Sequence, residues 1–239
     1  MQYRAIRPAV FLSRPNRFVA QVKQDGQLVT AHVKNTGRCA ELLVPGARVY
    51  LEYSQNASRR TPCDLVAVEK ETPAGPLLIN MDSAAPNMAA KEWLQAGGLG
   101  KLSQLRAEYQ LGNSRFDFYA NSEAGRMLVE VKGCTLEQDG VALFPDAPTL
   151  RGVKHLKELA TLAAEGWQCC LLVVIQMKGP RLFRPNWATH PAFGEAMREA
   201  ALAHVQLYAM DCLVTPDSMK LDAPVSIDLS TGDGKSFVV

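Results

Sequence analysis

The sequence predicts an α+β protein in which a small five-stranded OB-like β-barrel precedes an α/β domain with a mixed central sheet. Two observations predict this class. Between residues 17 and 80, short β-forming runs are separated by tight turns, and no long helical pattern occurs. After residue 83, segments with helical spacing alternate with strand-like segments. We therefore expect a barrel at residues 1–81, an α/β domain at 82–229 and a tail at 230–239.

Turn residues separate the expected barrel strands. Asp25-Gly26 is a hairpin signal, and Pro45-Gly46 is typical of a turn. Residues 72–76 contain two prolines and a glycine and form a turn or hinge before the last strand. The five expected strands are residues 17–23, 28–34, 47–53, 64–70 and 77–80.

The second domain opens with an expected helical segment at residues 83–105, interrupted by Gly97-Gly98. A hairpin is expected over residues 115–132. Residues 169–175 are apolar on both faces, which predicts a buried central strand. A helix at 191–204 and a strand at 205–212 complete the expected domain.

The segment at residues 149–165 predicts an amphipathic helix. Thr149 is the expected N-cap and Gly166 the expected C-terminal stop. Apolar residues at helical spacing predict its buried stripe. These residues are Leu150, Val153, Leu156, Leu159, Ala160 and Ala163.

The hairpin carries the most informative chemistry of the chain. With a period of two, Phe116 and Phe118 share one face of the first strand and Asp117 takes the other. On the second strand, Glu130 and Lys132 share a face. A short loop between the strands places Asp117 directly across from Glu130, so we expect two carboxylates and a lysine to converge on one polar, exposed face.

This constellation predicts a divalent-cation site with Mg or Mn as the cofactor. Both ions favour carboxylate oxygens, lower the pKa of a bound water and neutralise charge on a phosphate. Asp117, Glu130 and Lys132 are therefore the candidate catalytic residues, with Lys132 orienting the water or stabilising the phosphate. Either Glu108 or Glu92 could complete the metal site, and we favour Glu108 because it is nearer to the hairpin. The alternative is a hairpin face with ordinary surface charges.

Arg151 and His155 are candidate phosphate contacts in the helix that follows. They are four residues apart, so we expect them on one exposed flank near the helix N-terminus, where donors can face a phosphate. The alternative is a solvated helix face.

An aspartate followed by Glu-x-Lys on the next strand resembles the pattern of the PD-(D/E)XK nucleases. Over residues 8–229 the chain also resembles the sugar fermentation stimulation protein A (SfsA) family, because several short motifs occur in that family's order. These motifs are Asn16-Arg-Phe18, Asn35-Thr-Gly37, Pro45-Gly46, Ser114-Arg-Phe-Asp-Phe118, Val129-Glu-Val-Lys132, Phe144-Pro-Asp-Ala147, Thr149 to Gly152 and Lys154-His-Leu156.

The resemblance implies an OB-like barrel, a nuclease-like α/β domain and a DNA-binding protein of bacteria or archaea that regulates sugar (maltose) metabolism genes. OB barrels bind nucleic acid through charged grooves and exposed aromatic side chains. For each basic side chain of the barrel, simple solubility is the alternative. The candidate DNA contacts of the barrel are Arg14, Arg17, His32, Asn35, Arg38, Arg59 and Arg60.

Composition limits the other possibilities. The formal net charge is only +2, so a DNA-binding surface has to be local. None of the six cysteines forms a C-x-x-C pair, which argues against a zinc site. The longest apolar run is too short to cross a membrane and no secretory signal is found, so we expect a cytoplasmic protein without a membrane partner. Oligomeric state is left open, a homodimer included.

Three hypotheses follow from these residues. The first is a DNA-binding protein, largely independent of sequence, with a metal-dependent deoxyribonuclease site. The second is a non-catalytic transcriptional regulator that retains the nuclease scaffold, although no helix-turn-helix pattern is found. The third, which we rank lowest, is hydrolysis of a small phosphorylated metabolite.

Overall fold

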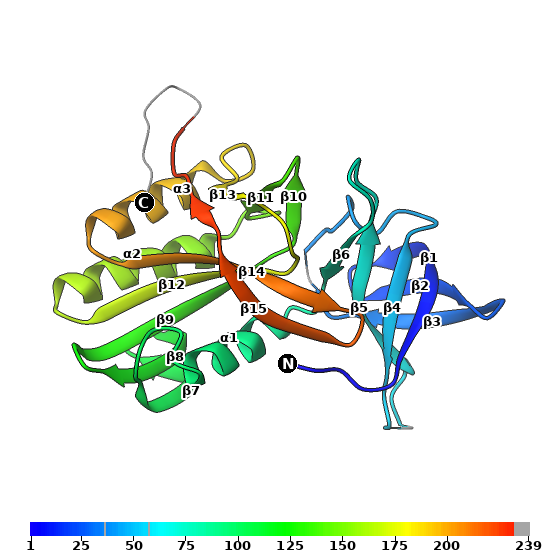
Figure 1. Ribbon diagram of the computed structural model, residues 1–239, viewed down its shortest axis with the longest axis horizontal. Coiled ribbons are helices and arrows are strands. Elements are labelled where there is room, and N and C mark those ends of the chain that lie inside the picture. Colours follow the sequence, from blue (N-terminus) through cyan, green and yellow to red (C-terminus); the bar gives the residue numbers. More distant parts are fainter. Residues whose placement is uncertain (36, 57, 232–239) are drawn as a thin grey trace.

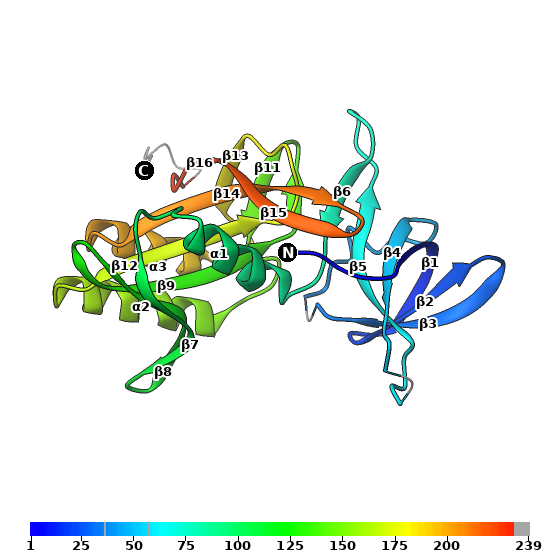
Figure 2. The same ribbon diagram turned by 60° about the horizontal axis from the view of Figure 1, so that its bottom comes forward.

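The computed structural model describes residues 1–35, 37–56 and 58–231. A barrel and a larger layered domain lie side by side, with the N-terminus at their junction (Figures 1 and 2). The Tyr3 N–H donates to the carbonyl of Asp217 at 2.7 Å, so the first residues of the chain pair with the second domain before they enter the barrel.

The barrel closes through parallel pairing of its third and fifth strands. The expected five-stranded OB-like barrel is confirmed, but the expected list of strands was wrong at both ends. The first strand was missed, because Pro8 and Pro15 interrupt its pattern and only Ala9 and Phe11 point into the core. The segment at 77–80 pairs outside the closed set. The strands are β1 (Ile6–Asn16), β2 (Val19–Gln24), β3 (Gln27–Val33), β4 (Arg48–Tyr53), β5 (Cys63–Lys70) and β6 (Leu77–Asn80).

The second domain is built on a mixed six-stranded sheet, which confirms the mixed central sheet expected for the α/β domain. Its order is β15-β14-β12-β9-β8-β7; β9, β12 and β14 run parallel, and the outer pairs are antiparallel. These strands are β7 (Ser103–Leu111), β8 (Ser114–Ser122), β9 (Gly125–Cys134), β12 (Gln168–Ile175), β14 (Gln206–Thr215) and β15 (Ser218–Pro224).

A smaller four-stranded sheet adjoins this domain, in the order β10-β11-β13-β16. Its strands are short, and the sequence analysis did not predict them. They are β10 (Leu136–Gln138), β11 (Val141–Phe144), β13 (Leu182–Pro185) and β16 (Ser226–Ile227).

Helices cover both faces of the large sheet. Helix α1 (Ala85–Gln95) packs in one apolar cluster with Val129 and Val131 of β9. Helices α2 (Leu150–Ala164) and α3 (Pro191–Leu202) cover the other face, in the cluster that contains Leu128. Alternate residues of β9 therefore face different helices, and Glu130 lies on the α2 side.

Two expectations for this domain were wrong. The helix expected over 83–105 ends at Gln95, because Gly97 takes a positive φ of 89° and the chain then turns into β7. Phe116 and Phe118 do not share a face. The β8–β9 ladder ends at the pair Phe118 and Val129, and beyond it Phe116 packs in the cluster under α2 while Phe118 packs under α1.

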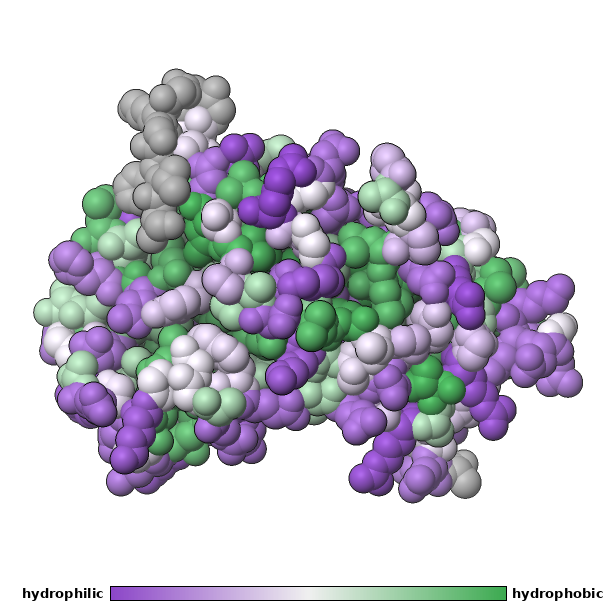
Figure 3. Space-filling model, in the orientation of Figure 1, coloured by the Kyte–Doolittle hydropathy of each residue, from purple (hydrophilic) through white to green (hydrophobic). Residues whose placement is uncertain are grey.

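A buried polar network joins the two domains. The Gln176 side-chain amide donates to the Asn80 carbonyl at 3.0 Å and to the Asp82 carbonyl at 3.2 Å. Asp82 is fully buried and forms an ion pair with Lys34 of the barrel at 2.7 Å. A Cβ atom at Gly133 would lie 2.4 Å from Gln176 Oε1, so the network packs directly against the backbone at the end of β9 and leaves no room there for a side chain. Apolar side chains gather where the barrel meets the second domain (Figure 3).

Two sequence features extend beyond the described residues. Thr36, in the motif at residues 35–37, lies outside them. Of the tail expected at 230–239, only residues 230 and 231 are described. In the described part of the chain, no helix has the length and apolar character needed to cross a membrane.

Candidate metal and nucleic-acid site

A pocket of about 260 Å³ lies where the ends of β8 and β9 meet the N-termini of α1 and α2. It brings together Asp117, Glu130, Lys132 and Arg151, four of the residues singled out in the sequence. Its lining consists of Ser83, Pro86, Asn87, Asp117, Glu130, Val131, Lys132, Gly133, Thr149, Arg151 and Gly152.

Hairpin register places Asp117 beside Glu130, as expected from the sequence. The last ladder pair is Phe118 with Val129, so the next positions of the two strands are Asp117 and Glu130. The Val131 N–H donates to Asp117 Oδ2 at 2.8 Å, and the Asn87 amide donates to Oδ1 at 2.8 Å. Burial, together with the nearby charge of Glu130, raises the pKa of Asp117 above its ordinary value.

Glu130 is only 2% exposed, so the expectation of a solvent-exposed polar face was wrong. Its Oε1 accepts hydrogen bonds from His155 Nδ1, at 2.5 Å, and from Lys132 Nζ. Burial alone would raise the pKa of Glu130, but these two donors outweigh it and lower the pKa. The Oε2 atom is buried and has no hydrogen-bond partner among the described residues. Glu130 is therefore a held, ionised carboxylate with one uncommitted oxygen.

His155 is 4% exposed, so its expected place on an exposed flank was also wrong. Because a carboxylate only accepts, Nδ1–H donates to Glu130, and Nε2 can then accept from Arg151 Nε at 3.4 Å. This arrangement is the neutral tautomer of the ring. His155 thus holds Glu130 from α2, and Arg151 is the member of the pair that reaches the pocket mouth.

The buried face of α2 is turned relative to the expected stripe. It consists of Gly152, His155, Leu156 and Leu159, whereas Leu150 is 80% exposed. Both ends of the helix were predicted correctly: Thr149 Oγ1 accepts from the Gly152 N–H at 3.0 Å, and Gly166 takes a positive φ of 89°.

Neither candidate for a third carboxylate lines the pocket. Glu108 is exposed on the edge strand β7, 3.8 Å from Arg115. Glu92 forms an ion pair with the N-terminal ammonium at 2.5 Å. Within residues 1–35, 37–56 and 58–231, no group of three or more His, Cys, Asp or Glu side chains could hold a metal ion. Asn87 was missed by the sequence analysis, although its place directly after Pro86 at the start of a helix was a usable signal.

Arg14, one of the expected DNA contacts, is used inside the barrel. Its guanidinium donates to the carbonyls of Arg17, Asn35, Gly37 and Arg38, at distances of 2.5 to 3.0 Å. It ties the β1–β2 turn to the loop after β3. Arg17 and Arg38 are exposed, and Asn35 Oδ1 accepts a hydrogen bond from the Gly37 N–H at 2.8 Å.

The remaining candidate DNA contacts of the barrel are His32, Arg59 and Arg60, and two of them lie beside Asp64 of β5. His32 and Arg59 both contact the carboxylate of Asp64, which Lys34 approaches at 3.8 Å. Burial would raise the pKa of Asp64, but the Arg59 hydrogen bonds and the nearby cations lower it. Arg60 is exposed.

The barrel reaches the pocket directly. Ser83, which lines the pocket, donates its hydroxyl hydrogen to the carbonyl of Lys34 at the end of β3. In the neighbouring loop, Gly37 lies against Asp146, because a Cβ atom at Gly37 would be 2.3 Å from Asp146 Oδ2. The loop after β3 therefore lies against the segment that leads into α2.

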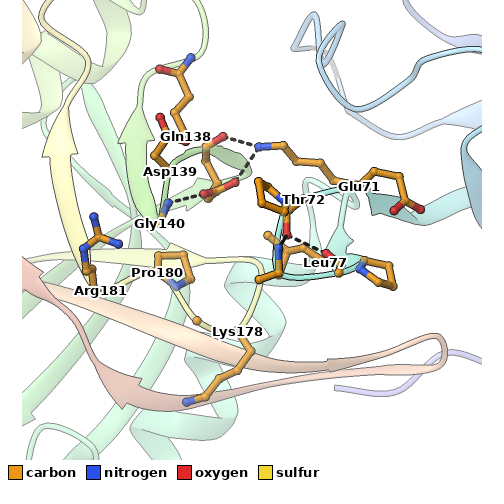
Figure 4. A pocket seen from close by; sticks show the side chains of 16 residues that line it. Glu71, Thr72, Leu77, Gln138, Asp139, Gly140, Lys178, Pro180 and Arg181 are labelled. Atoms are coloured by element: carbon orange, nitrogen blue, oxygen red, sulfur yellow. Dashed lines mark hydrogen bonds and ion pairs between the residues drawn. The ribbon is translucent and has the colours of Figure 1, made fainter.

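A larger pocket of about 790 Å³ lies elsewhere on the domain junction (Figure 4). Three of its charged residues, Lys70, Glu137 and Lys178, are engaged already. Lys70 Nζ lies 2.6 Å from Glu137 Oε2, and Lys178, which points away from the centre in Figure 4, forms ion pairs with Asp211 at 2.9 Å and Asp222 at 2.5 Å. This pocket does not include Asp117 or Glu130, the two neighbouring carboxylates described above.

Comparison with known proteins agrees with this architecture. Residues 12–77 match the family model described as the SfsA N-terminal OB domain, and residues 84–218 match the sugar fermentation stimulation protein RE domain. A sugar fermentation stimulation protein homolog of Desulfitobacterium hafniense (strain DSM 10664 / DCB-2) is 48% identical over 232 residues, which cover 97% of this chain and 100% of the relative. The homolog of Ruminiclostridium cellulolyticum is 43% identical over 230 residues, covering 96% and 100%.

One solved structure matches almost the whole chain. It is that of Pyrococcus furiosus SfsA in complex with Ca²⁺, with a TM-score of 0.83 and 25% identity. The match covers 95% of this chain and 97% of that one.

Proposed function

Because this chain belongs to the sugar fermentation stimulation protein A (SfsA) family, we propose that it binds DNA and holds a divalent cation on Asp117 and Glu130. We propose that the division at residues 81 and 82 separates a DNA-holding barrel from this metal-binding domain. DNA would be held mainly through its phosphates and thus largely independently of sequence. DNA binding is also the route by which we connect the chain to sugar metabolism.

The observation that carries the proposal is the uncommitted Oε2 of Glu130. A buried carboxylate oxygen without a donor is costly unless something satisfies it, and a cation does so directly. Asp117 supplies a second carboxylate beside it, so the donor set consists of hard oxygens that suit Mg²⁺ or Mn²⁺. The Ca²⁺ complex of the Pyrococcus furiosus protein supports divalent-cation binding in this family.

The side chains around the pair suit phosphodiester hydrolysis. A bound Mg²⁺ or Mn²⁺ would supply Lewis-acid stabilisation of phosphate charge and a water of lowered pKa. His155 fixes the direction of Glu130, while Asn87 and the Val131 N–H fix Asp117. Those contacts keep both carboxylates in place before DNA arrives.

The cationic side chains around the pocket suit the binding of a phosphate. Lys132 donates one hydrogen bond to Glu130 and has two more N–H donors for a phosphate oxygen or a water. The Arg151 guanidinium, at the pocket mouth, is placed for a neighbouring phosphate. Lys132 and Arg151 would thus both help to neutralise the charge on the phosphate.

One observation favours a second candidate, a non-catalytic DNA-binding regulator that retains the nuclease scaffold. Of the acidic residues that the structure describes, only Asp117 and Glu130 line the pocket. Such a pair could hold a cation weakly without supporting hydrolysis.

The two candidates separate in a cleavage assay. Single-stranded, duplex and branched DNA would be incubated with the protein, with and without Mn²⁺, beside the Asp117→Ala variant and the matched surface control Glu108→Ala. We expect Mn²⁺-dependent cleavage by the wild type and by Glu108→Ala, and none by Asp117→Ala, with DNA affinity in EDTA retained by all three. DNA binding without cleavage of any substrate would favour the regulator. Absence of DNA binding would contradict both candidates.

A further inference from the structure

The fold leaves the aromatic ring of Phe18 at the surface. Phe18 is 43% exposed, at the turn between β1 and β2. The turn holds its backbone at both ends: its N–H donates to Asn16 Oδ1 at 2.9 Å, and its carbonyl accepts from the Val33 N–H at 2.8 Å. An exposed ring on a fixed turn contributes little to the core, so its position calls for another explanation.

One cationic side chain contacts this ring, and a second is exposed on the neighbouring loop. The Arg17 guanidinium carbon lies 4.7 Å from the ring centroid, within the range of a cation–π contact. Arg38 is exposed on the neighbouring loop, and in the described part of the chain neither arginine forms an ion pair with an acidic side chain. We call Arg17, Phe18 and Arg38 the basic rim. Arg14 makes the rim one unit, because it donates to the carbonyls of both Arg17 and Arg38.

The basic rim lies next to the carboxylate pocket. Phe18 is hydrogen-bonded to Val33, and the next residue, Lys34, accepts a hydrogen bond from Ser83 in the pocket wall. A step of two or three residues spans roughly 10 Å of extended chain. The backbone of Phe18 is thus a few residues from Ser83, which places the basic rim on the barrel side of the pocket.

We propose that the basic rim is a stacking platform for one unpaired base, so that the DNA entering the pocket is single-stranded at this point. The inference rests on the proposed DNA binding and names the form of DNA that the site takes. The ring accepts the face of a base, and the two arginines take the adjoining phosphates. A base inside a duplex is stacked on its neighbours and cannot offer its face to Phe18 unless it is first extruded.

Fluorescence anisotropy tests this with a labelled oligothymidylate and a blunt duplex hairpin, both in EDTA so that no cleavage occurs. We expect the wild type to prefer the single strand. Phe18→Ala should weaken single-strand binding by about 5- to 100-fold, the range found when a stacking aromatic is removed. Phe18→Leu should behave like Phe18→Ala because it is apolar without a ring, and Phe18→Trp should retain affinity. Leu28→Ala, at a barrel position that is 69% exposed, is the matched control and should bind like the wild type.

The outcomes separate this inference from the proposed function. Equal binding of both DNA forms, unaffected by Phe18→Ala, would overturn the stacking platform and leave DNA binding intact. Loss of affinity in Phe18→Ala but not in Phe18→Leu would also overturn it, because apolar contact rather than stacking would then be responsible. A wild type that binds neither probe would overturn both. Far-UV circular dichroism of each variant checks that the barrel is folded.

Discussion

The hydrogen bond between His155 and Glu130 gives the sharpest energetic prediction. Both residues are buried, at 4% and 2% exposure, so solvent screens the contact little. A hydrogen bond to a charged group contributes about 1.5–3 kcal/mol to stability. Lys132 shares the same Glu130 oxygen and can compensate in part, so we expect a value toward the lower end of that range. The perturbation is a double-mutant cycle of His155→Ala and Glu130→Ala, because Glu130→Gln would keep an oxygen that accepts from His155 Nδ1.

Urea unfolding in EDTA, followed by tryptophan fluorescence, measures this coupling. Trp93, Trp167 and Trp187 all lie in the second domain, so the signal reports on the unit that contains the contact. We expect a coupling free energy of about 1.5–2 kcal/mol. The helical pair Lys154 and Glu158, 3.5 Å apart and less buried than His155 and Glu130, is the control and should couple by less than about 0.5 kcal/mol. A coupling for His155 and Glu130 no larger than that of the control would refute the claim that the histidine holds the carboxylate.

Three further predictions follow from the same contacts. Arg14→Ala should lower the free energy of unfolding by about 2–4 kcal/mol, because it leaves several carbonyls without their donor. Arg17→Ala is the control and should change the free energy of unfolding by less than about 0.5 kcal/mol. Thermal unfolding followed by circular dichroism compares the two variants. Because the pKa of Asp117 is raised above 3.8, Mn²⁺ affinity should fall by about tenfold per pH unit below that raised pKa, whereas an unchanged affinity throughout acid pH would argue against Asp117 as a ligand. The raised pKa means that the metal-free fold favours the protonated carboxyl of Asp117. Ionisation of Asp117 therefore lowers the stability of the metal-free protein as the pH rises. Glu108→Ala should leave Mn²⁺ affinity unchanged. A loss of Mn²⁺ affinity in this variant would show that Glu108 is a ligand after all.

The pairing of the carboxylates was predictable from the sequence because it depends on local geometry. A period of two and a short loop fix the register as far as the pair Phe118 and Val129, and the next residues of the two strands are Asp117 and Glu130. Helix α2 was equally local, with a cap at Thr149 and a stop at Gly166. These features need no information about distant parts of the chain.

The errors came from tertiary contacts. His155 looks like a surface residue in the sequence, and its burial depends on α2 lying over the sheet at Glu130. The change of face at Phe116 depends on where the β8–β9 ladder ends. Arg14 could not be distinguished from a DNA contact, because three of the four carbonyls that it binds belong to a loop more than twenty residues away.

Calorimetric titration of Mn²⁺ into the wild type and Glu130→Gln tests the central claim most directly. The account predicts binding of one ion per chain by the wild type. It also predicts a loss of at least about tenfold in affinity when the free carboxylate oxygen is replaced, since a neutral amide is a poor ligand for a hard cation. Equal binding by the two proteins, or no binding by the wild type, would contradict a metal centre at Asp117 and Glu130.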